Sequence, residues 1–451
     1  MSSWKKRTRS VTSPSPNEAL QKKRRIIEHE FKRDDDVLVV PETQSALQLH
    51  AVRQAYCITD DYAVPAVHDD GELLIKVTAV GLNPIDWKAP DYNFGIPTLP
   101  YIAGRELSGT VVKASQKSGS RIQKGHVVIV PSTDYRDLRK AAFQHYSITS
   151  TFNAIRIPNN VSTHAGSILG VAFVSAVLAL GICMGADFSS IEGGPDLLEM
   201  VRNVAPGSLP ADIQHECLQG IGKAERAKAG DFLVIWGGSS TCAYIAKQIA
   251  RLAGLRIVSI IDSAKHGLRL SCTDAVRSDL LVDSHDPDRA IEIVKANTGS
   301  RARFGLDTVG KESAKHLSRA LATPPTTLIP HTLPKETKAS ERTGNKLMTP
   351  PSTPHEKYSS LWRSHLVGLT GLPKDGVHED VALHNVPIKL FHEVPEIGEA
   401  MCAWCERLLA KGLLVPPDVV GTVEGLEGIN GGLDRMRRRE ISGGRLVALL
   451  K

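Results

Sequence analysis

The sequence predicts a mixed α/β fold with two domains: a small β-barrel-like domain and an α/β domain with a doubly wound parallel sheet. Short alternating strand patterns, separated by turns rich in Gly, Pro and Asn, fill the chain from Ser45 to about Ile157. An apolar strand, a turn of small residues and a helical pattern follow one another at Val234–Gly254. Beyond it, strand-like segments alternate with helical stretches at 286–297 and 311–321, which is typical of a parallel sheet.

Length and composition indicate a globular protein with a charged tail. The chain has 451 residues, of which 41% are hydrophobic and 23% charged, enough for two or three domains. Its net charge of +6 lies at the start, because residues 1–33 hold ten Lys/Arg and three Glu. We expect residues 1–40 to be a disordered basic tail. Its basic clusters could serve as a nuclear import signal, but we favour a solvated tail. Because no aromatic residues are interleaved with the basic ones, the tail predicts no specific nucleic-acid partner.

The first predicted domain is built from five strand patterns. They are ELLIKVTAVGL, SGTVVKAS, GHVVIVPS, QHYSITS and NAIRIP. Each alternates apolar and polar residues, as expected of strands with one buried face.

A long apolar segment follows them. Ile168–Ala186 is nineteen residues without a charge, the length of a membrane span. It lacks flanking clusters of Lys and Arg, so we favour a buried helix leading into the second domain, and no membrane. Two inserts interrupt the second domain, at 187–228 and at 322–360, the latter rich in Pro, Thr, Lys and Ser.

The seven cysteines show no spacing typical of a disulfide framework. With no signal peptide in the sequence, this favours a reducing compartment and a cytoplasmic protein, or a nuclear one if the tail directs import. Cys402 and Cys405 form a C-x-x-C pair that is typical of redox or metal sites. They lie in the amphipathic pattern EIGEAMCAWCERLLAKG without a second ligand pair, so we favour the core-facing side of a helix.

The segment VIWGGSSTCAYIAKQIARLAG has the layout of a dinucleotide-binding unit, in which a helix N-terminus receives a pyrophosphate. Gly237 and Gly238 open the turn, but the G-x-G-x-x-G pattern is absent. An ordinary strand-to-helix turn with a capping serine therefore stays open as the alternative.

Five motifs in order carry a resemblance to a known family: GELLIKVTAVGLNPIDWK, PYIAGRELSGTVV, AGDFLVIWGGSST, FGLDTVG and ISGGRLVALL. The chain resembles the medium-chain dehydrogenase/reductase superfamily, in its zinc-independent branch of quinone oxidoreductases and enoyl reductases, including fungal trans-acting enoyl reductases. The resemblance implies a GroES-like β-barrel domain at 41–166, completed by 413–451. It also implies a Rossmann-type nucleotide-binding domain at 167–412 that contains the two inserts.

The resemblance implies a nicotinamide cofactor on the GGSST turn, where hydroxyls of Ser239, Ser240 and Thr241 add donors for phosphate oxygens. After the second strand, Asp262 suits an NAD ribose, whereas Ser263 and Lys265 suit the 2′-phosphate of NADPH. We expect NADPH, with NADH as the alternative. The remaining predicted cofactor contacts are Gly237, Gly238, Cys242, Ser284, Asp86 and Lys88.

Zinc ligands are missing from the family's catalytic positions, which here hold Asn83 and Arg105, so we expect no metal. Arg105 is interpreted as a structural partner of Glu106. The resemblance implies that the Ile85–Lys88 run approaches the cofactor. The predicted catalytic residues are Asn83, Lys88 and Ser175, with Lys88 stabilising negative charge and Ser175 holding substrate while water supplies the proton.

Three functions remain open from the sequence. We favour NADPH-dependent reduction of an activated carbon–carbon double bond, in a quinone, enone or enoyl thioester, by hydride transfer without zinc. The alternatives are an alcohol or carbonyl dehydrogenase and a non-catalytic NAD(P)-binding regulator. The expected partner is a small-molecule substrate or acyl thioester, and the expected oligomeric state is a monomer or homodimer.

Overall fold

A computed structural model describes residues 39–114, 119–205, 207–321 and 363–451. The predicted tail, up to residue 38, and the predicted insert 322–360 lie outside the described residues. The chain divides into an N-terminal segment, Met1–Pro41, and a compact unit, Glu42–Lys451, that contains the described helices and strands.

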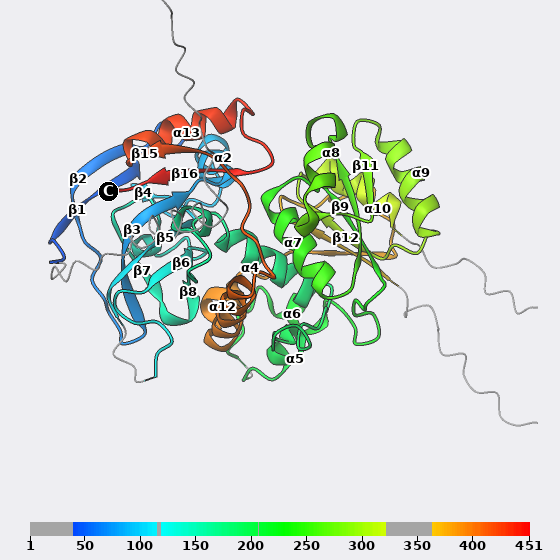
Figure 1. Ribbon diagram of the computed structural model, residues 1–451, viewed down its shortest axis with the longest axis horizontal. Coiled ribbons are helices and arrows are strands. Elements are labelled where there is room, and N and C mark those ends of the chain that lie inside the picture. Colours follow the sequence, from blue (N-terminus) through cyan, green and yellow to red (C-terminus); the bar gives the residue numbers. More distant parts are fainter. Residues whose placement is uncertain (1–38, 115–118, 206, 322–362) are drawn as a thin grey trace, which may run out of the picture. The chain divides into compact units, whose positions relative to one another are not determined.

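A six-stranded parallel sheet confirms the predicted doubly wound domain (Figure 1). Its strands are β9 (Phe232–Trp236), β10 (Arg256–Ile261), β11 (Leu280–Asp283), β12 (Phe304–Asp307), β13 (Ser364–Gly368) and β14 (Val381–His384). Their order in the sheet is β11-β10-β9-β12-β13-β14. The order reverses between β9 and β12, so the carboxyl ends of these two strands form the switch point where doubly wound sheets bind ligands.

Alternate residues of each strand face opposite sides of this sheet. In β9, Leu233 and Ile235 join the core formed with α4 (Gly170–Leu178), α7 (Thr241–Leu252) and α12 (Pro395–Ala410). The intervening residues face the other core, formed with α9 (Pro287–Thr298) and α10 (Lys311–Ala320). Because both faces are buried, the strand reads as a continuous apolar run rather than as an alternating one.

Helix α9 lies within one residue of the helical stretch predicted at 286–297, and capping residues define both of its ends. The Asp286 side chain accepts a hydrogen bond from the Arg289 N–H at the N-cap, and Pro287 occupies the first turn. Gly299 ends the helix in the left-handed conformation at φ 59°.

The segment 187–228 contributes α5 (Leu197–Arg202) and α6 (Gln214–Gln219), which pack on the same side as α12. The Trp404 indole of α12 stacks on Phe188 at 4.9 Å and donates a hydrogen bond to the Ile191 carbonyl. Cys402 and Cys405 are buried on α12, consistent with the core-facing interpretation of that pair. The remaining helices of this half are α8 (Ser263–Cys272) and α11 (Lys389–Glu393).

The long apolar segment forms α4 and a π-helical turn at Ala179–Cys183. Among the described residues, the helical stretch Thr163–Cys183 is long and apolar enough to cross a membrane. Its most apolar window is 89% buried inside the structure, which is also what the core helix of a soluble protein shows.

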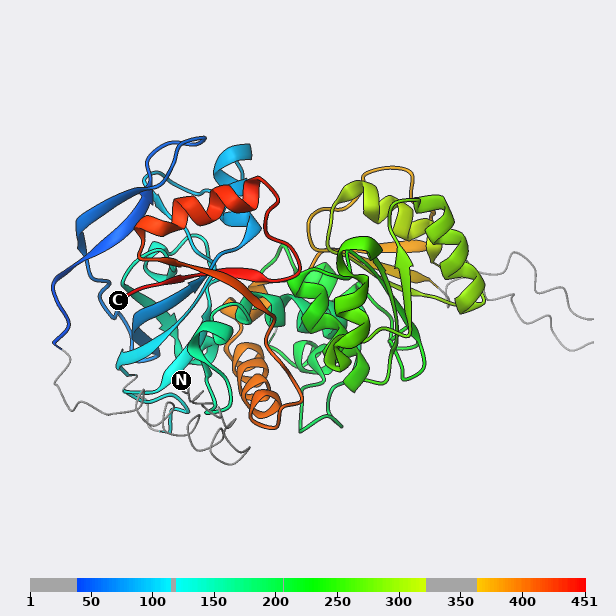
Figure 2. The same cartoon turned by 45° about the horizontal axis from the view of Figure 1, so that its top comes forward.

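The second large sheet combines strands from both ends of the chain. It contains β3 (Glu72–Gly81), β5 (Glu106–Lys113), β6 (Val127–Pro131), β7 (Tyr146–Ser150), β8 (Ile155–Arg156), β15 (Val419–Glu424) and β16 (Arg445–Leu449). The C-terminal β16, red in Figure 2, runs antiparallel beside β3, with Val447 opposite Gly81. A smaller sheet of β1 (Thr43–Leu49), β2 (Cys57–Ala63) and β4 (Tyr101–Ile102) and the helices α2 (Pro84–Tyr92), α3 (Thr163–Gly166) and α13 (Glu427–Arg437) complete this half.

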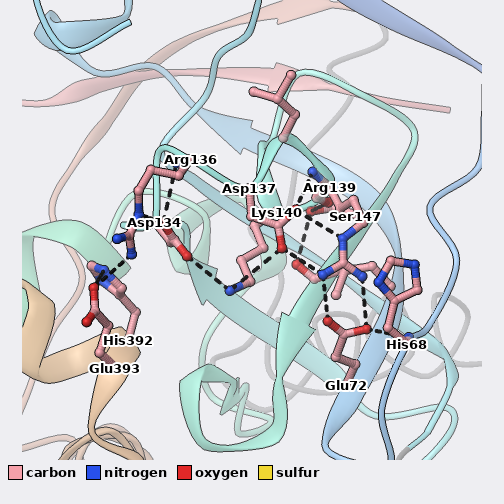
Figure 3. Close-up of polar contacts among 12 residues, drawn as sticks. His68, Glu72, Asp134, Arg136, Asp137, Arg139, Lys140, Ser147, His392 and Glu393 are labelled. Carbon is pink, nitrogen blue, oxygen red and sulfur yellow. Dashed lines mark hydrogen bonds and ion pairs between the residues drawn. The ribbon is translucent and has the colours of Figure 1, made fainter. Parts of the chain in front are cut away.

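A chain of ion pairs joins this half to α11 through the loop after β6 (Figure 3). Arg139 pairs with Glu72 at the start of β3, and Arg136 pairs with Glu393 of α11, each at 2.8 Å. Thr133 and His392 make a hydrogen bond of 2.8 Å beside them. Single exposed ion pairs stabilise little, but several charges in one network fix the loop more firmly.

Candidate functional site

The turn after β9 is tied to its neighbouring strands. The N–H groups of Gly237 and Gly238 both donate to the Ile260 carbonyl of β10, at 3.0 and 3.1 Å. The Thr308 hydroxyl, just beyond β12, donates to the Gly237 carbonyl at 2.9 Å. Gly237 has φ 80°, and a Cβ there would lie 2.4 Å from the Thr308 hydroxyl oxygen. Glycine is therefore required at this point of the switch-point turn.

The N-terminus of α7 presents unused donors. The Ser240 hydroxyl accepts from the Ala243 N–H at 3.1 Å and caps the helix. Within the described residues, no group accepts a hydrogen bond from the N–H of Ser239, Thr241 or Cys242, and the Ser239 hydroxyl is likewise unbonded. Backbone N–H groups at a helix N-terminus favour an anion, so this turn fits a pyrophosphate.

Arg445 places a positive charge beside this turn. The side chain is 6% exposed and comes from β16, at the far end of the chain. Its Nε donates to the Thr241 hydroxyl at 3.0 Å, and its Nη1 donates to the Leu82 carbonyl at 3.2 Å. One guanidinium thus connects the start of α7 to the loop that precedes α2.

The Glu106 side chain holds the same loop, the one that precedes α2, in place. Its carboxylate is fully buried and accepts from the Asn83 side-chain amide at 2.9 Å and from the Val171 N–H of α4 at 2.9 Å. Burial raises the pKa of Glu106, whereas Arg445 and these hydrogen bonds lower it. Asn83, predicted to be catalytic, also donates to the Gly81 carbonyl at 3.1 Å. Its amide N–H groups are therefore engaged in holding the loop.

The other predicted catalytic residues lie on the two helices that start here. Lys88 is half-buried on α2, with its ammonium 5.7 Å from the centre of the Trp87 ring, and makes no ion pair among the described residues. Ser175 is half-buried on α4, one turn after Val171. Their helix N-termini meet at Asn83 and Glu106, so the structure brings the two elements together.

The predicted nucleotide contacts beyond the turn lie at the carboxyl ends of β10 and β11. The Asp262 carboxylate caps α8 by accepting from the Lys265 N–H at 2.9 Å. The Ser263 N–H donates to Asp283 at 3.0 Å, and the Ser284 N–H donates to the Ile261 carbonyl at 2.8 Å. The Lys265 ammonium is exposed and has no partner among the described residues. All four predicted residues share the sheet edge that holds the α7 turn.

Comparison with known proteins agrees with this fold. Residues 69–159 match the alcohol dehydrogenase GroES-like domain family. The chain is 25% identical to the trans-enoyl reductase mycC of Thermothelomyces thermophilus, over 91% of this chain and 98% of that one. It is 26% identical to the trans-enoyl reductase caaB of Aspergillus niger, with the same coverage of 91% and 98%.

A solved structure shares the fold over most of the chain. The Escherichia coli quinone oxidoreductase complexed with NADPH has a TM-score of 0.59 at 14% identity, covering 90% of this chain and 99% of that one. The chain belongs to the medium-chain dehydrogenase/reductase superfamily. Within it, the chain lies in the zinc-independent branch of enoyl reductases and quinone oxidoreductases.

The positions of the superfamily's catalytic zinc ligands do not fit a metal in this reductase. Arg105 is 4% exposed, donates to the Tyr101 hydroxyl at 2.7 Å and lies 3.5 Å from the centre of the Tyr135 ring. The buried Arg105 guanidinium would repel a metal ion at this position. The expected pairing of Arg105 with Glu106 is wrong among the described contacts. Side chains of neighbouring residues in an extended chain point to opposite sides. Glu106 therefore contacts α4, whereas Arg105 contacts Tyr101 and Tyr135.

Asp86 is a buried carboxylate beside this guanidinium. Its Oδ2 accepts from the Asn83 N–H at 2.7 Å, and no described group bonds its Oδ1. Burial raises the pKa of the Asp86 carboxyl to about 6, while Arg105 and the Asn83 hydrogen bond act in the opposite direction. Asp86 was predicted to contact the cofactor, whereas no sequence pattern indicated that Glu106 and Arg445 organise this loop.

Asp86→Asn should remove part of the pH dependence of stability. The folded-state pKa of about 6 lies above the ordinary value of 3.8, so the folded chain binds this proton more tightly. The resulting stability is fully present below the ordinary pKa and is lost as pH rises through the folded one. Between about pH 4 and pH 7.5, the wild-type free energy of unfolding should fall by roughly 2–3 kcal/mol relative to the variant. Denaturant titrations at several pH values measure this, and parallel curves for the two proteins contradict it.

Proposed function

We propose that this reductase transfers a hydride from NADPH to an activated carbon–carbon double bond, in an enone, quinone or enoyl thioester, without zinc. The observation that carries the proposal is the bridge from Thr241 through Arg445 to Leu82. It brings an unused helix N-terminus at the switch point to the loop and helix that hold Asn83 and Lys88. The names of the trans-enoyl reductase relatives support the same reaction class.

The chain's own groups suit the binding of a dinucleotide. The free N–H groups of Ser239, Thr241 and Cys242 would donate to the pyrophosphate, and the Arg445 guanidinium would offset its charge. Gly238 lets the turn lie close against β10, since a Cβ there would lie 2.7 Å from the Ser259 Cβ. When bound, the reduced nicotinamide supplies the hydride.

At the acceptor, the protein's task is to orient the substrate and to stabilise negative charge. Lys88 on α2 makes no ion pair among the described residues, so it is available to a developing enolate oxygen. Ser175 offers a hydroxyl from α4 to hold the substrate, and water delivers the proton to the carbon next to the carbonyl. Asn83 acts through Glu106, as a positioning residue that fixes the loop.

The preference for NADPH rests on Lys265. Its exposed ammonium and the Ser263 hydroxyl lie at the end of β10, where a 2′-phosphate is read in this fold. Asp262 and Asp283 add negative charge to the same edge, although Asp262 is engaged as the cap of α8. Hydrogen bonds from the Ser263 and His285 N–H groups lower the pKa of Asp283 to about 2. The choice between NADPH and NADH thus depends on whether the positive charge of Lys265 outweighs the negative charges of Asp262 and Asp283.

A panel assay tests the reaction itself. Purified full-length protein is given NADPH or NADH with enones, quinones, enoyl thioesters, and simple aldehydes and ketones, and cofactor oxidation is followed by absorbance. We expect turnover with at least one conjugated acceptor and none with simple carbonyls. Turnover of simple aldehydes or ketones alone would support a carbonyl reductase instead. Cofactor binding without any turnover would support a nucleotide-binding regulator.

The two serines of the turn should differ in effect. Ser239→Ala removes a hydroxyl that is free to bond a phosphate oxygen, so NADPH affinity should fall about tenfold or more. Ser240→Ala removes the α7 cap and should lower the free energy of unfolding by about 1 kcal/mol. Calorimetric titration and denaturant unfolding of both variants measure the two effects. Unchanged affinity in Ser239→Ala would make the turn a purely structural one.

Lys265→Ala should weaken NADPH and leave NADH nearly unchanged, because only NADPH carries the 2′-phosphate. Loss of one charged hydrogen bond predicts a decrease of about tenfold. Lys295→Ala, on the last turn of α9, is the matched control and should change neither affinity. Equal affinities of the variant and the wild type for NADPH would argue for NADH as the cofactor.

A further inference from the structure

A second cluster of reactive side chains lies away from the dinucleotide site. Cys183 ends the π-helical turn after α4, Glu216 lies on α6, and His384 is the last residue of β14. One ligand atom of each lies within 4.8 Å of the ligand atoms of the other two. Cys183 and His384 are 0% and 2% exposed, and the Glu216 side chain is 16% exposed. We call these three residues the Cys183–Glu216–His384 cluster.

Two histidines connect the cluster to a second carboxylate. His384 Nδ1 lies 2.7 Å from Glu216 Oε1, and His384 Nε2 lies 2.9 Å from His365 Nδ1. His365 is 1% exposed, and its Nε2 lies 3.9 Å from Glu225 Oε1 without a hydrogen bond. The polar atoms therefore run in one line from Glu216 to Glu225.

Counting protons along this line favours a cation at its Glu216 end. If a neutral His384 donates from Nδ1 to Glu216, its Nε2 must accept from His365, whose bare Nε2 then faces the Glu225 carboxylate. If His384 donates from Nε2 instead, His365 can direct its Nε2–H toward Glu225. The His384 Nδ1 lone pair then faces a Glu216 oxygen at 2.7 Å. Either a second proton on His384, which makes it an imidazolium that donates to Glu216, or a metal ion bound by both acceptors resolves that contact.

The cluster supplies three of the four donors of a tetrahedral zinc ion, and a water molecule would supply the fourth. Thiolate, imidazole nitrogen and carboxylate oxygen are all common zinc ligands. Bonds of about 2.0–2.3 Å in a tetrahedron place ligand atoms roughly 3.3–3.8 Å apart, so the cluster needs adjustments of about 1 Å. One thiolate and one carboxylate balance the charge of Zn²⁺, which lowers the cost of burying the ion. His384 would then donate from Nε2 to His365, the outer-shell contact that fixes a metal-bound histidine.

We propose that Cys183, Glu216 and His384 form a structural zinc site that fastens the segment 187–228 to the edge of the parallel sheet. The site lies apart from the superfamily's catalytic zinc positions, which hold Asn83 and Arg105. It departs from the sequence-based expectation of no metal, because the three ligands lie in different elements and share no motif. The ion connects α6 with β14 and with the end of the apolar helix, so its binding energy adds to the stability of the fold.

Metal analysis of the full-length protein tests this directly. Protein purified without chelator or added metal should contain about one zinc per chain by mass spectrometry, if the site is filled on folding. Chelator-stripped protein should bind one Co²⁺ and show the absorption of a tetrahedral, thiolate-bound cobalt ion. Wild-type protein with far less than one zinc and no cobalt–thiolate absorption overturns the proposal, and the line is then a metal-free pair of His384 with Glu216.

Variants locate the ion. Cys183→Ala should abolish the cobalt–thiolate absorption, and Glu216→Gln should weaken zinc by tenfold or more while leaving the thiolate band. Cys405→Ala, at an equally buried cysteine on α12, is the matched control and should retain both the metal and the band. A band that survives Cys183→Ala and disappears in Cys405→Ala places the metal elsewhere and overturns the assignment. If Cys183→Ala does not fold, cobalt titration of the wild type and of Glu216→Gln still decides.

Discussion

The buried carboxylate of Glu106 holds together the elements on which the candidate site depends. It accepts hydrogen bonds from the Asn83 amide and from the first turn of α4. Strand β5, the loop that precedes α2, and helix α4 are therefore held together by this one carboxylate. A fully buried carboxylate is costly unless donors and positive charge surround it. Burial raises the pKa of Glu106, and the N-terminal dipole of α4 and the nearby Arg445 offset part of this effect.

Arg445 extends this arrangement to the parallel sheet. Because β16 pairs with β3, the last strand of the chain returns to the first large sheet and points its first residue at α7. The same guanidinium therefore serves Glu106, the Leu82 carbonyl and the start of the dinucleotide turn. A shift of either sheet would leave the guanidinium or the carboxylate without a partner, so electrostatics couples the geometry of the two halves.

Local patterns were sufficient to predict the sheet and its helices, because alternation, capping and apolar periodicity act over a few residues. The carboxyl edge that gathers Ser239, Asp262 and Ser284 was also predictable, since parallel strands place their ends together. Contacts between distant segments were not. Arg445 is 204 residues from Thr241 and 363 from Leu82, so no spacing reveals it. The expected pairing of Arg105 with Glu106 was wrong because adjacency in an extended segment separates side chains.

The GGSST turn shows at which positions the fold requires glycine. Gly237 and Gly238 remain at the two positions where a Cβ would strike Thr308 and Ser259. Two positions later Ser240 caps α7 with its hydroxyl, which a glycine has no side chain to do. Thr241 likewise provides the acceptor that holds Arg445. Steric exclusion keeps glycine where the turn crosses its neighbours, and hydrogen bonding selects hydroxyls where the helix begins. A glycine count alone is therefore a poor guide to whether such a turn can receive a phosphate.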